Sequence, residues 1–238
     1  MATAPTKSPT RPAKRAKASP TETPPSTEST YDNVHMHGEG GLETEARRRG
    51  AGRFGAPWRE QTEIEENPIG LDAGTVTAII PDLDRLQATF WVLYHQYHKH
   101  HWLVVGPSFL ELHRFLEEHY TEVHSHLDAI AERMTALGGI PTSDPVNQAR
   151  LAHVPHEPEG MYRIRPMLTH DRAAEATLAV ALRATIRTAA DRGDYGTETL
   201  LKHILVKTED RAHHLDHFLD SYTLEVGLTA NEGEVQEG

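Results

Sequence analysis

Between Ser108 and Gly139 the apolar residues recur every three or four positions, and no proline interrupts them. This spacing places the apolar side chains on one face of a single long α-helix. The face is formed by Phe109, Leu112, Leu116, Tyr120, Val123, Leu127, Ile130, Met134 and Leu137. A helix of about eight turns with one apolar face must bury that face against neighbouring elements, which constrains the fold more than any other feature of the chain.

A second helix of the same kind is predicted just before this one. Its face carries Leu83, Leu86, Phe90, Leu93, Tyr97 and His101. We expect Pro81 to lie in its first turn or to kink it there, since proline cannot donate a backbone hydrogen bond. Gly106 and Pro107 should end this helix, and the spacing of Ser108 and Glu111 predicts a capping box at the start of the next.

Two further helices are predicted after a long connection. They span roughly Met167 to Asp191 and Gly196 to Tyr222, and the connection from about 140 to 165 holds four prolines and room for one short helix. No alternating pattern typical of strands occurs in the sequence. Four long helices with one long central crossover predict an all-α, ferritin-like four-helix bundle.

The two ends of the chain differ from the middle in composition. Residues 1–20 hold five cations and no acid, so that this segment is formally +5 in a chain of net charge −11, which leaves −16 for residues 21–238. The cations are Lys7, Arg11, Lys14, Arg15 and Lys17. We therefore expect a disordered basic, proline-rich tail over residues 1–70, the bundle over 71–226 and a short acidic tail over 227–238.

Composition also excludes several classes of protein. The chain has no cysteine, which rules out disulfides, thiolate chemistry and iron–sulfur ligation. No stretch approaches the roughly 20 apolar residues of a membrane span, and the N-terminus has no apolar signal-peptide core. The expected location is the cytoplasm, with nucleoid association if the basic tail binds DNA. His35 and His37 in the tail are interpreted as a bland segment, with transition-metal binding as the alternative.

Four potential metal ligands share one flank of the helix after Ser108. At 100° per residue, Glu117, Asp128 and Glu132 lie at about 40°, 60° and 100° from His113, beside the apolar stripe. Glu117 and Asp128 are nevertheless 11 residues apart, which is about 16 Å along the axis. Since ligand atoms must approach a metal to about 2.0–2.2 Å, one helix cannot deliver both pairs to one ion.

This spacing predicts a metal site shared between two subunits. An antiparallel copy of the helix across a two-fold axis would bring Asp128 and Glu132 of one chain to His113 and Glu117 of the other, with His101 as a further ligand. Imidazole and carboxylate together suit iron, manganese or zinc. The competing interpretation is a solvated face, in which Glu117 or Glu132 pairs with a neighbouring arginine, Arg114 or Arg133. No Glu-x-x-His motif occurs, which disfavours a di-iron site inside one bundle.

The region from Tyr94 to Gly139 resembles the signature of the Dps family, the DNA-binding proteins from starved cells. The matching stretches are YHQYHKHHWLVVGPSFLELHRFLEE and HLDAIAERMTALGG. The resemblance implies an inter-subunit ferroxidase centre formed by His101, His113, Glu117, Asp128 and Glu132. It further implies a spherical dodecamer that oxidises Fe(II), with hydrogen peroxide as preferred oxidant, and stores the ferric product inside.

The same resemblance suggests roles for other residues. Trp102 would lie beside the centre and scavenge a radical, with simple packing as the alternative. Independently of the resemblance, His124 falls at about the same helical angle as Glu117 and Asp128, which makes it the best additional metal candidate. The segment LVKTEDRAHHLDHFL is similar to the last helix of the cyanobacterial and halophilic branch, but a ligand role for His214 is in doubt because Asp128 is present. Carboxylates near the turn between the last two helices are candidates for an iron pore, with a solvated turn as the alternative: Asp191, Asp194 and Glu198.

Three functions remain open from the sequence. The first is iron oxidation and storage, which would protect DNA from oxidative damage. The second is a nucleoid-binding architectural protein whose basic tail contacts phosphates. The third is a non-catalytic buffer that holds zinc or manganese at the same ligands.

Overall fold

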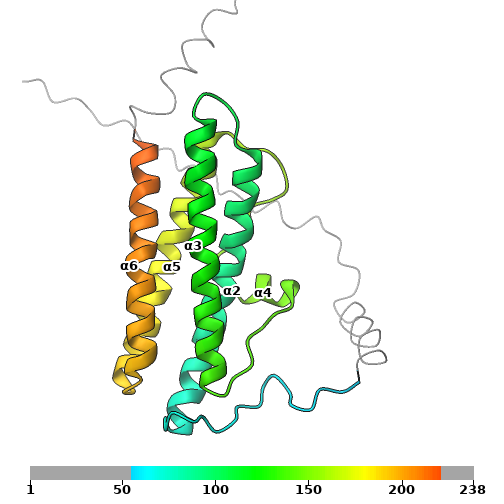
Figure 1. The fold of residues 1–238 in the computed structure, drawn as a ribbon, viewed down its shortest axis with the longest axis vertical. Helices are drawn as coiled ribbons and strands as arrows, with labels where there is room; N and C mark the ends of the chain where they lie inside the picture. Colours follow the sequence, from blue (N-terminus) through cyan, green and yellow to red (C-terminus); the bar gives the residue numbers. More distant parts are fainter. Residues whose placement is uncertain (1–54, 221–238) are drawn as a thin grey trace, which may run out of the picture. The chain divides into compact units, whose positions relative to one another are not determined.

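The computed structural model describes residues 55–220 and contains five helices in this range, labelled as in Figure 1. They are α2 (Ala73–Leu103), α3 (Phe109–Ala136), α4 (Pro145–Leu151), α5 (Ile164–Asp191) and α6 (Tyr195–Leu219). The described residues include no strand, which confirms the all-α prediction. No described helix is long and apolar enough to span a bilayer.

The four long helices lie side by side as two pairs (Figure 1). α2 packs along α3, and α5 packs along α6, while the two pairs meet mainly through α2 and α5. The crossover from α3 to α5 carries the short α4, which rests against α2. The predicted bundle with one long central crossover is therefore confirmed.

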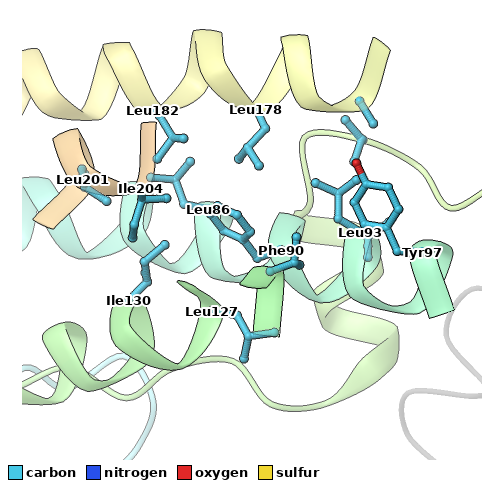
Figure 2. Packing of buried hydrophobic residues seen from close by; sticks show 14 of the residues in the cluster. Leu86, Phe90, Leu93, Tyr97, Leu127, Ile130, Leu178, Leu182, Leu201 and Ile204 are labelled. Carbon is cyan, nitrogen blue, oxygen red and sulfur yellow. The ribbon is translucent and has the colours of Figure 1, made fainter. Parts of the chain in front are cut away.

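The interior of the bundle is built from the apolar faces that the periodicity predicted. Figure 2 shows Leu86 and Phe90 of α2, Leu127 and Ile130 of α3, and Leu178 of α5 converging on one cluster. Each fully buried leucine contributes roughly 1.5–3 kcal/mol relative to an exposed one.

Two members of the predicted α3 stripe are not in this interior. Phe109 is exposed and Tyr120 is only half-buried. Both rings contact histidines at the end of the bundle where α2 meets α3.

Two predictions about helix ends were wrong. The side chain of Ser108 makes no capping bond; instead, Gly106 at φ +105° closes a turn in which the Phe109 amide donates to the Gly106 carbonyl at 3.0 Å. Pro81 lies inside α2 rather than in its first turn, because Asp72 caps the helix further upstream by accepting from the Thr75 amide at 3.0 Å.

The predicted tail boundary at residue 70 also needs correction, since the compact unit that contains the helices begins at Pro57. The Gly138 carbonyl at the end of α3 accepts from Arg59 Nη1 at 2.9 Å and from the Glu65 amide at 3.0 Å. A Cβ on Gly138 would lie 2.2 Å from the Glu65 carbonyl oxygen, so only glycine allows this approach. Residues 59–65 are held by hydrogen bonds and have no apolar periodicity. The search for apolar periodicity in the sequence therefore did not reveal this segment.

Several predictions lie outside the described residues. They are the basic residues of the tail, His35 and His37, the acidic segment 227–238 and the expected end of the last helix at Tyr222.

Candidate metal centre

The tight connection from α2 to α3 brings His101 and His113 face to face. α2 ends at Leu103 and α3 begins at Phe109, so His101 lies in the last turn of one helix and His113 in the first turns of the next. The two imidazoles stack with centroids 3.7 Å apart and an interplanar angle of 22°. Both side chains are half-buried.

Each of these histidines hydrogen-bonds to the backbone of the other. His101 Nδ1 lies 2.8 Å from the His113 carbonyl oxygen, and His113 Nδ1 lies 2.9 Å from the His101 carbonyl oxygen. A carbonyl only accepts, so both rings must carry their proton on Nδ1. In this tautomer the Nε2 lone pair of each ring is left for another partner. A histidine that binds a metal through Nε2 needs this tautomer.

Glu117 lies one turn beyond His113 and is exposed. It contacts Tyr120, where burial first and the Glu117 carboxylate second raise the pKa of the phenol. The centroid of the Tyr120 ring lies 4.1 Å from that of His98 and 5.3 Å from that of His101.

Trp102 extends this ring cluster and stacks on His98 at 4.7 Å, although 65% of its surface is exposed. Other large apolar side chains exposed at this connection are Leu103, Val105, Phe109 and Leu110.

Asp128 and Glu132 are both exposed on α3, and His124 is exposed between the two pairs. Within the described residues of one chain, no three or more histidine or acidic side chains gather closely enough to hold a metal ion. The predicted ligands of one chain therefore form two separate groups, the candidate half-sites. The first group is His101, His113 and Glu117 near the start of α3, and the second is Asp128 and Glu132 further along it.

Arg133 was the alternative partner considered for Glu132, but it is engaged elsewhere. Its Nη2 pairs with Asp194 at 2.6 Å and its Nε donates to Thr197 Oγ1 at 2.8 Å.

This contact also corrects the pore assignment of Asp194. Asp194 is only 1% exposed and caps α6 by accepting from the Thr197 amide at 3.0 Å. The nearby Glu198 pairs with Lys202 at 2.5 Å, and Asp191 is exposed at the end of α5.

His214 lies on α6, away from the His101–His113 pair. Its ring is 6.5 Å from His119 and 6.3 Å from His213. This position gives no support to a ligand role beside His113.

A buried polar network that the sequence analysis did not predict crosses the bundle. Arg211 of α6 is 2% exposed and donates from Nε and Nη2 to the two oxygens of Glu175 in α5, at 2.7 and 3.1 Å. Its Nη1 donates to Glu122 of α3 at 2.7 Å, and Tyr97 of α2 donates its hydroxyl proton to Glu175 at 2.7 Å. The Arg211–Glu175 pair thus connects all four long helices.

A second part of the network is centred on Asp171, one turn before Glu175. Asp171 accepts from Gln96 Nε2 at 2.7 Å and from His100 Nδ1 at 2.8 Å, while His100 Nε2 lies 2.8 Å from Glu157. Burial opposes charge on His100, but the hydrogen bonds and charges of Asp171 and Glu157 outweigh it and raise the pKa of this imidazole.

The network occupies the inward-facing carboxylates Glu175 and Asp171, so that they are not free to bind iron. A di-iron site inside one bundle needs free carboxylates that project inward from the helices. Here Glu175 is neutralised by Arg211, and Asp171 is neutralised by His100. A sequence signal did exist, since Asp171 and Glu175 stand at buried positions of the stripe between Leu168 and Leu178.

Comparison with known proteins places these observations in a family. The family model described as a ferritin-like domain matches residues 81–224. The chain is 41% identical over 158 residues to the nutrient stress-induced DNA-binding protein of Synechococcus sp., which covers 66% of this chain and 90% of that relative.

Solved structures give the same result. The archaeal Dps homologue of Halobacterium salinarum matches with a TM-score of 0.69 and 36% identity, covering 71% of this chain and 94% of that one. The Dps protein of Vibrio cholerae O1, described as a member of a broad superfamily of ferritin-like diiron-carboxylate proteins, matches with a TM-score of 0.62 and 25% identity over 66% of this chain and 99% of its own.

Proposed function

This chain belongs to the Dps family of ferritin-like proteins, and we propose that it oxidises Fe(II) at centres shared between two subunits. His101, His113 and Glu117 of one protomer and Asp128 and Glu132 of its partner would bind the iron. The ferric product would be stored within a homo-oligomeric shell, a dodecamer as the resemblance implies. Removal of Fe(II) and peroxide together protects DNA, because those two reactants generate hydroxyl radicals.

The reciprocal hydrogen bonds between His101 and His113 carry this proposal. They fix both rings in the Nδ1–H tautomer, so that both Nε2 atoms are held ready for a metal before it arrives. Such preorganisation is unnecessary for two solvated surface histidines.

The chemistry follows from the ligand set. Hydrogen peroxide accepts two electrons when its O–O bond breaks, so two Fe(II) ions each supply one and two protons complete two molecules of water. Three carboxylates stabilise the higher charge of Fe(III) over Fe(II). Trp102 and Tyr120 would supply an electron when only one Fe(II) is bound, which would confine the radical to the protein.

The experiment targets Asp128 and Glu132, the two ligands that the partner subunit would supply. Fe(II) is added anaerobically to the full-length protein, followed by hydrogen peroxide, and ferric absorbance is followed with time. Fast oxidation with soluble iron is expected for the parent protein, and a large loss for the Asp128→Ala/Glu132→Ala variant.

A matched control removes two exposed carboxylates outside the centre, in Glu159→Ala/Asp210→Ala, and should oxidise iron at the parent rate. Equal rates in all three proteins would contradict the proposed centre. Zinc or manganese retained by the same ligands without iron turnover would support the metal-buffer function instead.

DNA binding is a second proposed activity, favoured by the basic segment that holds Lys7, Arg11, Lys14, Arg15 and Lys17. The Synechococcus relative is named a DNA-binding protein. Five cations repeated on every subunit of an oligomer would bind phosphates multivalently, with a strong dependence on salt. Deletion of residues 1–20 should abolish a DNA mobility shift and leave iron oxidation unchanged; a shift that persists would exclude the tail as the DNA contact. The protein would then act in the cytoplasm, at the nucleoid.

A further inference from the structure

The last turns of α6 carry a pair of histidines that the iron centre does not use. His213 and His217 are four residues apart, exposed, and oriented so that their Nε2 atoms lie 3.1 Å from each other. Residues at i and i+4 are neighbours on a helix surface, so the rigid backbone fixes the separation of the two imidazoles.

The distance between the two nitrogens matches that of two ligands on one metal ion. With metal–nitrogen bonds of about 2.1 Å, two nitrogens 3.1 Å apart subtend an angle of about 95° at the ion. An angle near 90° is that of neighbouring ligands in tetragonal and octahedral complexes. Copper(II) and nickel(II) prefer such geometry with nitrogen and oxygen ligands.

The electrostatic surroundings also favour a cation at this position. His217 lies in the last turn of α6, where the unsatisfied carbonyls form the negative end of the helix dipole. Asp210 is exposed one turn before His213. The nearest arginine on the helix, Arg211, faces the interior and is committed to Glu175 and Glu122.

We propose that His213 and His217 form a second metal site, which chelates one divalent transition-metal ion of the copper or nickel type per subunit. The cation takes the place of the single proton that the two Nε2 atoms otherwise share. Among the described residues no third protein ligand joins them, so water molecules complete the coordination. This site is independent of the proposed iron centre, which lies on α2 and α3.

The site can be tested by nickel(II) titration calorimetry on the full-length protein. The His101→Ala/His113→Ala background is used so that the two imidazoles of the proposed iron centre do not contribute. His213→Ala and His217→Ala should each lower the nickel stoichiometry by one ion per subunit, or weaken that site at least about tenfold, the lower end of what loss of even an outer-shell group costs.

His203→Ala is the matched control, since His203 is also exposed on α6 and has no part in the pair. It should leave the titration unchanged. One equivalent of copper(II) should give an electron paramagnetic resonance spectrum with coupling to two imidazole nitrogens in the background protein and to fewer in either variant. Identical titrations for the background, His213→Ala and His217→Ala would overturn the proposal, as would an equal loss in His203→Ala.

Discussion

The core network around Arg211 and the candidate half-sites along α3 are made from the same kinds of residues, and they differ in where their counter-charges come from. In the core, Glu175 and Asp171 meet Arg211 and His100 of the same chain at hydrogen-bonding distance. On α3, Asp128 and Glu132 are exposed, and the arginine next to them pairs with Asp194 instead.

The difference shows how a position decides the role of a carboxylate. A buried carboxylate must find a cation within its own chain, because desolvation of an unpaired charge is too costly. An exposed carboxylate has no such requirement and stays available for an ion or a second subunit. The comparison therefore separates a structural network from a candidate reactive one.

The largest effect is expected on breaking the core network. Arg211→Met leaves Glu175 buried without its counter-charge, which should destabilise the protein by about 3–5 kcal/mol. The matched surface change, Asp128→Ala, should alter stability by less than about 0.5 kcal/mol. Chemical denaturation followed by circular dichroism measures both, and equal destabilisation would erase the distinction between the two regions.

Acid should weaken the core next. Burial first, and the charge of Arg211 second, lower the pKa of His119 to about 4 from 6.5. The folded state favours the neutral ring. The free energy of unfolding therefore has its full value above pH 6.5 and decreases as the pH falls from 6.5 towards 4. For His119 alone the loss at pH 5 is about 2 kcal/mol.

His126 has its pKa lowered to about 4 for the same reasons and should act in the same direction. Denaturation curves at pH 7 and pH 5 measure the sum. A His119→Gln variant should lose less stability between these two pH values than the parent; an unchanged difference would show that His119 does not contribute.

The affinity for a metal ion tests the role of Glu117 on α3. Glu117→Gln keeps the shape of the side chain and removes its charge, so it should weaken Fe(II) or Zn(II) binding at least about 10- to 100-fold. Glu118→Gln is the neighbouring control, because Glu118 is equally exposed but is not part of the half-site. Similar affinities in the two variants would remove Glu117 from the centre.

The smallest effect on stability is expected from replacing the tyrosines Tyr97 and Tyr120. Tyr97→Phe removes one buried hydrogen bond to Glu175 and should cost about 1 kcal/mol of stability. Tyr120→Phe should leave stability nearly unchanged but should reduce a tyrosyl radical signal during peroxide turnover at limiting iron. A radical of the same intensity in Tyr120→Phe would assign it to another ring.

The sequence predicted much of this architecture because apolar periodicity reports directly on which face of a helix is buried. The stripe from Leu112 to Leu137 identified α3 nearly to its ends. The same helical angles grouped Asp128 and Glu132 with Glu117 on one side of that helix, and all three are exposed. The ligand spacing predicted a site shared between two chains, since the rise of a helix is a property of the backbone alone.

Polar contacts between distant segments were beyond this reasoning. His100 stands among many histidines in the sequence, and nothing local indicates that it meets Asp171 and Glu157 in the interior. Asp194 was assigned to a pore from its place in a turn, whereas Arg133, 61 residues away, holds it as a buried cap. Such pairings depend on which helices are adjacent, which periodicity does not specify.

The proposed centre takes His113 and Glu117 from one subunit and Asp128 and Glu132 from another. It is tested most directly by complementation between His113→Ala/Glu117→Ala and Asp128→Ala/Glu132→Ala subunits, each inactive alone. After unfolding and co-refolding of equal amounts, half of the dimers would be mixed, and each would hold one intact centre, so iron oxidation should return to about one quarter of the parent activity. A mixture that stays as inactive as its components would contradict the shared centre.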